Sequence, residues 1–324
     1  MRVREATQAR VLNLRVGELV RVRSKGEILA TLDEEGELDS LPLMPEMLQF
    51  CGQQLVVYKV AHKLCDTIEF KGMRRMEQAV HLEGARCGGE AHGGCQAGCL
   101  IYWKEAWLER VNSIGNGEVT AGYPAEAGRC TLPILTAATR KEPTPAGEEV
   151  FSCQATEILR AAPEYLPFRD IGQYVQDIRS GNVGVRATLH AFAVGLFNRV
   201  QEYSRRGLPR ALWFRGGLRW GFLEGKAAKT PTGRTDLQPG DLVQVKPVDE
   251  ILRTVNAGLL NRGLSFDQEM VKYCGQHARV LRRVNRIVDD KTGKMLELSN
   301  PCIVLDNVVC SGDYNVSCPR AIYP

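Results

Sequence analysis

Apolar and polar residues alternate in several short stretches towards the two ends of the chain. Residues 278–288 read ARVLRRVNRIV, and apolar runs at 294–299 and 302–310 follow a polar turn around Gly293. A period of two is typical of strands with one buried face. The pattern therefore predicts a fold that is mainly β at the ends of the chain.

The middle of the chain has a helical period instead. Residues 171–181 place apolar side chains on one face, with Asp170 as the expected N-cap and Gly181 as the expected end. Residues 186–203 form a second stripe. That stripe consists of Leu189, Phe192, Ala193, Leu196, Phe197 and Val200. We therefore expect a mainly β protein with a helical insert.

The two ends of the chain resemble each other. Residues 14–101 align without a gap to residues 237–324 at a constant offset of 223, and about a quarter of the positions are identical. Matched positions include Glu46 with Glu269, Cys87 with Cys310, and Cys95 with Cys318. Such self-similarity predicts two copies of one fold.

Each copy combines short strands with an opening such as PGDLVQVK at residues 239–246, over about 90 residues. In these features it resembles the SH3-like barrel, including the KOW-type barrels of translation proteins. The resemblance implies a fold of two SH3-like barrels joined by a helical middle segment, and it implies no particular activity.

Two stretches rich in proline and charge, residues 139–149 and 226–240, are typical of linkers. They predict a first repeat at residues 1–138, a mostly helical middle segment with a basic linker at 139–236, and a second repeat at 237–324.

No apolar run is long enough to span a bilayer, and the first ten residues lack the apolar core of a signal peptide. We expect a cytoplasmic protein with no membrane partner.

Eleven cysteines in a chain without an export signal argue for metal ligation or reactive thiols rather than disulfides. Residues 87–99 read CGGEAHGGCQAGC, which offers four donors that zinc accepts, namely Cys87, His92, Cys95 and Cys99. The glycines between them allow the backbone to curl so that the donors converge. Trp103 and Trp107, one helical turn apart, predict a helix directly after Cys99.

Several metal assignments remain open. A Cys3His set would hold zinc, whereas Cys65 with the three loop cysteines would supply the four thiolates of an iron–sulfur cluster. The second repeat offers a further possible set in Cys274, Cys302, Cys310 and Cys318. The alternative to any metal is that these cysteines are small buried apolar residues.

Other candidates have a weaker basis. Cys153 lies where a helix is expected to begin, which would favour a thiolate nucleophile. His62 and His81 are candidate metal ligands, because they share a repeat with the cysteine loop. His190 lies on the second expected helix, away from that loop. Phosphate-loop, serine-hydrolase and zincin motifs are missing from the sequence.

Arginines and aromatic residues are interleaved at residues 205–226, and a basic RRVNR stretch lies at 282–286. This composition is compatible with binding to nucleic acid or to an anionic peptide or carrier, or with aromatic packing that leaves the arginines in solvent.

The sequence thus predicts a metal-dependent enzyme of a bacterial biosynthetic pathway that acts on an unknown small molecule or peptide. The alternative is a zinc-stabilised tandem SH3-like module that binds nucleic acid or a peptide.

Overall fold

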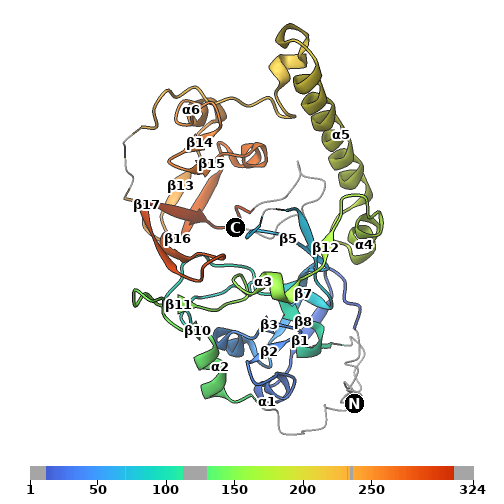
Figure 1. Cartoon of the computed structure of the whole chain (residues 1–324), viewed down its shortest axis with the longest axis vertical. Helices are drawn as coiled ribbons and strands as arrows, with labels where there is room; N and C mark the ends of the chain where they lie inside the picture. The colour runs from blue at the N-terminus through green and yellow to red at the C-terminus, as the bar shows by residue number, and fades with distance from the viewer. Residues whose placement is uncertain (1–11, 70, 112–129, 232, 234–235, 310–324) are drawn as a thin grey trace. The chain divides into compact units, whose positions relative to one another are not determined.

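The structure is a computed structural model, and it describes residues 12–69, 71–111, 130–231, 233 and 236–309 (Figure 1). The chain divides into two compact units. Unit 1 contains Met1–Asn182 and Arg286–Leu296, and unit 2 contains Val183–Asn285 and Glu297–Pro324. The three-part division expected from the linkers stays a prediction.

Unit 1 is built from short strands and helices. Its elements are β1 (Leu19–Val22), α1 (Lys25–Leu29), β2 (Glu37–Leu38), β3 (Leu41–Pro42), η1 (Pro45–Phe50), β4 (Gln54–Val60), β5 (Lys63–Cys65), β6 (Met73–Arg75), β7 (Ala79–Leu82), β8 (Trp103–Lys104), η2 (Glu105–Trp107), β9 (Leu108–Arg110), α2 (Leu132–Ala138), β10 (Arg140–Lys141), β11 (Val150–Phe151), α3 (Ile158–Ala161), β12 (Tyr165–Leu166) and α4 (Gly172–Ser180).

The principal sheet of unit 1 has five strands in the order β8-β7-β4-β1-β9. All its neighbouring strands are antiparallel. In β1 the side chains of Val20 and Val22 are fully buried while their neighbours are exposed, as the alternating pattern requires. Strand β1 leads into α1, which begins with a capping box between Ser24 and Glu27.

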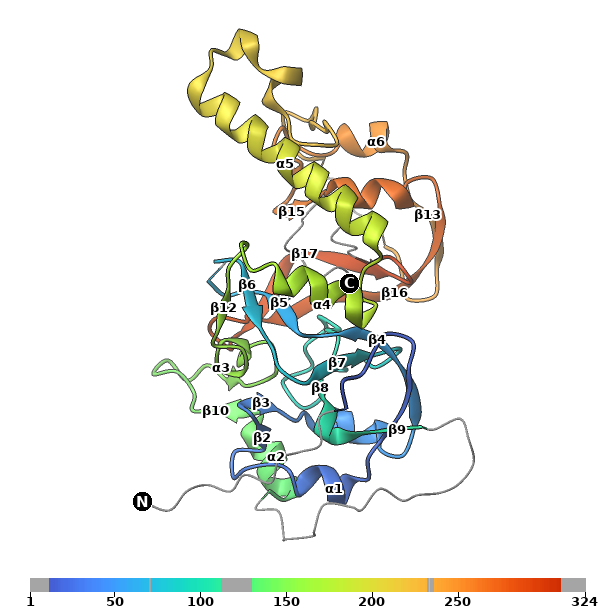
Figure 2. The ribbon, with the colours of Figure 1, turned by 90° about the vertical axis from the view of Figure 1, so that its right-hand side faces the viewer.

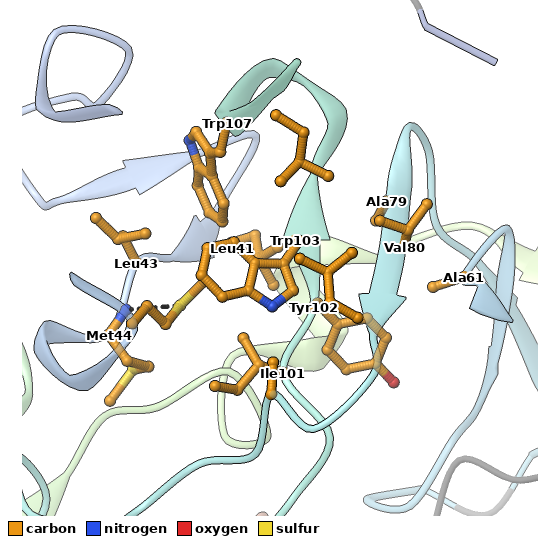
Figure 3. Close-up of a cluster of buried hydrophobic side chains, with 14 of the residues drawn as sticks. Leu41, Leu43, Met44, Ala61, Ala79, Val80, Ile101, Tyr102, Trp103 and Trp107 are labelled. Atoms are coloured by element: carbon orange, nitrogen blue, oxygen red, sulfur yellow. Dashed lines mark hydrogen bonds between the residues drawn. The ribbon is translucent and has the colours of Figure 1, made fainter. Parts of the chain in front are cut away.

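The main core of unit 1 lies against this sheet (Figure 3). Trp103 and Trp107 are both fully buried in it. The indole nitrogen of Trp107 donates to the Thr31 hydroxyl at 3.0 Å, and the ring of Phe50 packs edge-on against Trp103. These two indoles are the largest fully buried side chains among the described residues.

The helix expected at Trp103 and Trp107 was wrong. Trp103 lies in β8, the single turn η2 follows, and β9 continues the chain. The carboxylate of Glu105 in η2 accepts hydrogen bonds from the backbone amides of Leu12, Asn13 and Leu14. A turn between two strands buries both indoles and also presents this carboxylate to the N-terminal segment, which local periodicity does not reveal.

Unit 2 contains the long helix α5 and a second group of short elements (Figure 2). These are α5 (Val185–Gly207), η3 (Arg210–Leu212), η4 (Phe214–Gly217), β13 (Leu242–Gln244), α6 (Val248–Leu252), β14 (Leu260–Asn261), β15 (Leu264–Ser265) and η5 (Gln268–Tyr273). Strands β16 (His277–Val288) and β17 (Met295–Leu305) form a hairpin whose tip, residues 286–296, belongs to unit 1.

Short elements near the two ends of the chain follow one spacing. Leu19 at the start of β1 and Leu242 at the start of β13 are 223 residues apart, and the same interval separates α1 from α6 and η1 from η5. Strands β2 and β3 likewise correspond to β14 and β15. The offset of the gapless sequence alignment therefore also relates these short elements, although the strands that follow differ in length, with β4 at 54–60 and β16 at 277–288.

Two expectations about the fold are corrected. Helices contain 27% and strands 25% of the chain, so the content is mixed rather than mainly β. No closed barrel forms among the described residues, because β8 and β9 lie at opposite edges of the sheet. The helices at 171–181 and 186–203 are confirmed as α4 and α5, with Gly181 in a left-handed C-cap, but the N-cap of α4 is Ile171 rather than the expected Asp170. Within the described chain, no helix has the length and apolar character needed to cross a membrane.

Candidate metal centre

The loop at residues 87–99 is closed at its base by backbone contacts. Arg86 and Leu100 form an isolated antiparallel bridge, and the amide of Cys87 donates to the carbonyl of Cys99 at 2.9 Å. The guanidinium of Arg86 also donates to the carbonyl of Gly98 at 3.0 Å. These contacts bring the two ends of the loop together, so the cysteines at both ends are neighbours.

Glycine makes the interior of the loop possible. Gly89, Gly93, Gly94 and Gly98 all have positive φ, which other residues rarely adopt. At Gly89 the backbone is so close that an added Cβ would lie 1.9 Å from the carbonyl oxygen of Cys95. The amides of His92 and Gly94 both donate to the Gly89 carbonyl. The expectation that glycine lets the loop curl on itself is confirmed at these positions.

Three side chains converge beside this loop. Potential ligand atoms of Glu46, Cys87 and His92 all lie within 4.8 Å of one another. The Cys87 sulfur is 3.3 Å from Glu46 Oε1 and 3.6 Å from His92 Nε2, and His92 Nδ1 is 3.3 Å from Glu46 Oε1. A carboxylate, a thiol and an imidazole in this arrangement are suitable ligands for a borderline metal such as zinc.

The polar atoms of this group are buried and incompletely satisfied. The side chains of Glu46 and His92 are only 4% and 2% exposed. Glu46 Oε2 and His92 Nδ1 are both buried without a hydrogen bond of good geometry. Since a buried carboxylate oxygen without a partner is costly, a bound cation would satisfy it.

Cys95 lies outside this group of three converging donors, but it interacts with His92. Its sulfur accepts a hydrogen bond from the amide of Val288 at 3.3 Å. Burial acts to raise the pKa of the Cys95 thiol, but hydrogen bonds from His92 and from the amides of Ala97 and Val288 outweigh it and lower the pKa. In turn, burial opposes the charged form of His92, but its interactions with Cys95 and with the Glu46 carboxylate raise its pKa to about 9.

Cys99 and Cys153 lie in the same region. Burial, with smaller contributions from Cys153, Cys95 and Asp290, raises the pKa of Cys99 to about 12. Burial likewise raises the pKa of Cys153 to about 11. Cys153 lies five residues before α3 rather than at its start, and its raised pKa works against the thiolate that a nucleophile needs.

The tip of the β16–β17 hairpin packs against the loop within unit 1. Cys95, Phe151 and Val288 form a small buried cluster with Met295. The amide of Gln96 donates to the Arg286 carbonyl, and the amide of Phe151 donates to the Gly293 carbonyl. The cysteine loop is therefore held by a segment almost two hundred residues further along the chain.

The other predicted metal ligands lie apart from the triad. The Cys65 sulfur is 3.9 Å from the Met73 sulfur, in the β5–β6 hairpin. Cys274 and Cys302 are half-buried, and within the part of the chain that the structure describes they belong to no group of three metal donors. Cys310 and Cys318 lie outside the described residues. These assignments stay predictions.

The remaining histidines have structural partners or lie at the surface. His62 Nε2 is 3.2 Å from Asp177 Oδ1, and the fully buried Lys63 contacts the other oxygen of Asp177 at 2.6 Å. His62 also lines a cavity of about 450 Å³. His81 donates from Nδ1 to the Ile101 carbonyl at 2.8 Å, and His190 is exposed on α5.

Sequence reasoning missed Glu46 as a member of the site. This residue lies in η1, 41 positions before Cys87. Its only signal in the sequence was the match of Glu46-Met47 to Glu269-Met270 in the second repeat. Its approach to the loop depends on the packing of η1 in the core, which the sequence pattern does not show.

Comparisons of this chain with protein-family models, with curated proteins and with solved structures found no match. The geometry of the site is therefore the basis for an assignment of function.

Proposed function

We propose that this chain is a binding protein whose first repeat is stabilised by a zinc ion held by Glu46, Cys87 and His92. The observation that carries the proposal is the convergence of these three donors, from two separate segments, around a buried carboxylate oxygen without a partner. Thiolate, imidazole and carboxylate are all common zinc ligands. The ion would tie the glycine-rich loop to η1, which offsets the entropy cost of ordering that loop.

Cys95 is the fourth ligand in this proposal. His92 and the neighbouring amides of Ala97 and Val288 favour its thiolate. Cys99 is less suitable, because it lies outside the group of three converging donors and His92 is not among the groups that lower its pKa. This set retains Cys87, His92 and Cys95 of the predicted Cys3His site and replaces Cys99 with Glu46.

A stabilising role fits the site better than catalysis. A catalytic zinc keeps a coordination position open to substrate, whereas structural sites are closed and four-coordinate. Glu46 and His92 are almost completely buried, which leaves little access for a substrate. The metal-dependent enzyme expected from the sequence would need an open position at this site.

The proposed scaffold is a tandem pair of SH3-like folds. Two observations support it. The sheet order β8-β7-β4-β1-β9 is a meander whose last strand returns beside the first, with a single turn, η2, before that strand. The 223-residue interval that relates the elements of the two repeats supports a duplication.

An iron–sulfur cluster is a second candidate, and one observation favours it. Cys95, Cys99 and Cys153 are close enough to influence one another's pKa values, and Cys99 has the same effect on Cys87. Four thiolates are the usual ligand set for such a cluster. In this case Cys153, rather than Cys65, would be the fourth ligand.

Elemental analysis and a visible spectrum of protein purified without oxygen test the proposal. We expect about one zinc per chain and no colour, whereas iron with sulfide and a brown absorbance would favour the cluster. The matched variants Cys95→Ser and Cys99→Ser then locate the fourth ligand. Zinc affinity should fall at least tenfold for Cys95→Ser and stay within about threefold for Cys99→Ser.

Glu46→Gln tests the carboxylate itself, since it removes the charge with little change in shape. The variant should lose zinc affinity and also lose the zinc-dependent gain in thermal stability. Protein that contains neither zinc nor iron when isolated, and that gains no stability on titration with zinc, would overturn the proposal.

A further inference from the structure

The arginine lobe, residues 183–229, has a strong local excess of positive charge. It contains nine lysines and arginines against two acidic residues, a net charge of +7, whereas the whole chain has a net charge of +4. The rest of the chain is therefore net negative. Concentration of positive charge in one segment is the electrostatic signature of binding to an anionic polymer.

Side-chain hydrogen bonds anchor the loop after α5 to that helix. The side-chain amide of Gln201 donates to the carbonyls of Phe214 and Leu218, at 2.8 and 2.9 Å. The amide of Trp220 donates to the Asn198 side chain at 2.7 Å. Gln201 is 3% exposed, so these contacts are shielded from water.

Most aromatic side chains of the lobe pack on one another. The ring of Phe197 on α5 contacts Phe214, Trp220 and Phe222, with centroids 5.5 to 6.0 Å apart. This small cluster fixes the loop to the helix. It also accounts for much of the interleaved aromatic pattern in the sequence.

Trp213 has a different environment. Its indole nitrogen donates to the Leu208 carbonyl, and the guanidinium groups of Arg205 and Arg210 lie 5.6 and 5.8 Å from its ring centroid. Trp213 also lines a cavity of about 320 Å³. An indole beside two arginines combines a flat apolar surface with positive charge.

The same cavity is strongly basic. Arg205, Arg206 and Arg219 line it, and its one acidic side chain, Glu202, pairs with Arg206 at 2.6 Å. Arg205 and Arg219 form no ion pair among the described residues, so their charges are available to a ligand. The cavity therefore offers two guanidinium groups beside an indole ring.

We propose that the arginine lobe binds single-stranded nucleic acid, with one nucleotide in this cavity. The base would lie against Trp213, and Arg205 and Arg219 would neutralise the phosphates on either side. Stacking on an aromatic ring combined with backbone neutralisation is the way in which proteins hold unpaired strands. A duplex fits less well, because its bases are stacked on one another and cannot enter a cavity of this size.

The RRVNR stretch lies outside the residues that line this cavity. Arg283 donates to Asp236 and to the Leu237 carbonyl, and Arg286 donates to the Gly93 carbonyl in unit 1. Two of its three arginines are thus engaged within the protein. The proposal is also independent of the metal centre, because the cavity residues all belong to unit 2.

Fluorescence anisotropy with the full-length, metal-loaded protein tests this proposal. The probes are labelled 12-residue oligo(U) and oligo(dT), titrated over a series of salt concentrations. We expect micromolar or tighter binding at low salt that weakens as salt increases. Tighter binding of oligo(U) would identify RNA, and the reverse would identify DNA.

Three variants separate the contributions of phosphate neutralisation, base stacking and general positive charge to the binding affinity. Arg219→Ala should weaken binding about tenfold and reduce the slope of log affinity against log salt by about one. Trp213→Leu should weaken binding about tenfold without changing that slope. Arg186→Ala, which removes a charge of the same lobe outside the cavity, should have a smaller effect than Arg219→Ala. Far-ultraviolet circular dichroism checks that each variant is folded.

Two results would overturn the proposal. Absence of binding to both oligonucleotides at low salt would exclude nucleic acid, and displacement of the probe by polyglutamate as effectively as by unlabelled oligonucleotide would indicate an acidic peptide partner. Equal effects of Arg186→Ala and Arg219→Ala, with no effect of Trp213→Leu, would show diffuse charge attraction and exclude the nucleotide cavity.

Discussion

The sulfur of Cys95 accepts a hydrogen bond from the backbone amide of Val288, 193 residues later in the chain. The contact joins the cysteine loop to the tip of the β16–β17 hairpin, and both segments belong to unit 1. It stabilises the thiolate form of Cys95, which is the form that binds metals. The chemistry of the loop therefore depends on a distant segment.

The packing of this hairpin tip leads to a prediction for two adjacent glycines. Gly93 and Gly94 have nearly the same φ, +73° and +71°. An added Cβ at Gly93 would lie 2.5 Å from the Phe151 ring, whereas at Gly94 it would meet nothing within 4 Å. Gly94→Ala should reduce the free energy of unfolding by about 1 kcal/mol through backbone strain alone.

Gly93→Ala should cost about 1–3 kcal/mol more, because the methyl group must displace Phe151. Urea denaturation of both variants measures the difference. Equal midpoints for the two variants would contradict the packing of Phe151 against the loop.

His81 predicts a pH dependence of stability. Its side chain is fully buried against the core, and burial lowers its pKa to about 4 although Nδ1 donates to the Ile101 carbonyl. The unfolded chain binds a proton near pH 6.5, so the folded state is favoured above that pH and loses stability as the pH falls towards 4. The loss over this range should be about 3 kcal/mol.

The variant His81→Gln removes this titration while it keeps a donor for the Ile101 carbonyl. Urea denaturation between pH 7 and pH 4 should show a shallower fall in stability than in the original protein. Some fall should remain, since burial also lowers the pKa of His62. The exposed His190→Gln serves as a control and should leave the profile unchanged. A profile for His81→Gln as steep as that of the original protein would contradict the assignment.

The ion pair between Lys63 and Asp177 leads to a further prediction. Lys63 is fully buried and its ammonium group is 2.6 Å from Asp177. Asp177→Asn would leave this charge buried without a counter-ion, so it should reduce the free energy of unfolding by about 3–5 kcal/mol.

Asp249→Asn is the matched control for that variant. It breaks a pair with Arg253 in which both side chains are more than 60% exposed. Such a change should cost less than about 0.5 kcal/mol. Similar thermal midpoints for the two variants would show that water reaches Lys63 and would contradict its burial.

The sequence predicted features that depend on near neighbours in the chain. Helices α4 and α5 follow from apolar residues at helical spacing, and Gly181 ends α4 because it adopts a left-handed conformation at low cost. Cys87 and His92 come together because they are five residues apart in a loop that glycine allows to curl. In each case the determining contacts are local.

The tertiary structure decided the features that depend on distant segments. Glu46 reaches the site only because η1 packs beside the cysteine loop, and Val288 reaches Cys95 only because the hairpin tip folds onto unit 1. Trp103 and Trp107 have helical spacing, but burial of both indoles between β8 and β9 outweighs that local preference. Long-range burial and hydrogen bonding are properties of the whole fold, so periodicity and spacing alone do not reveal them.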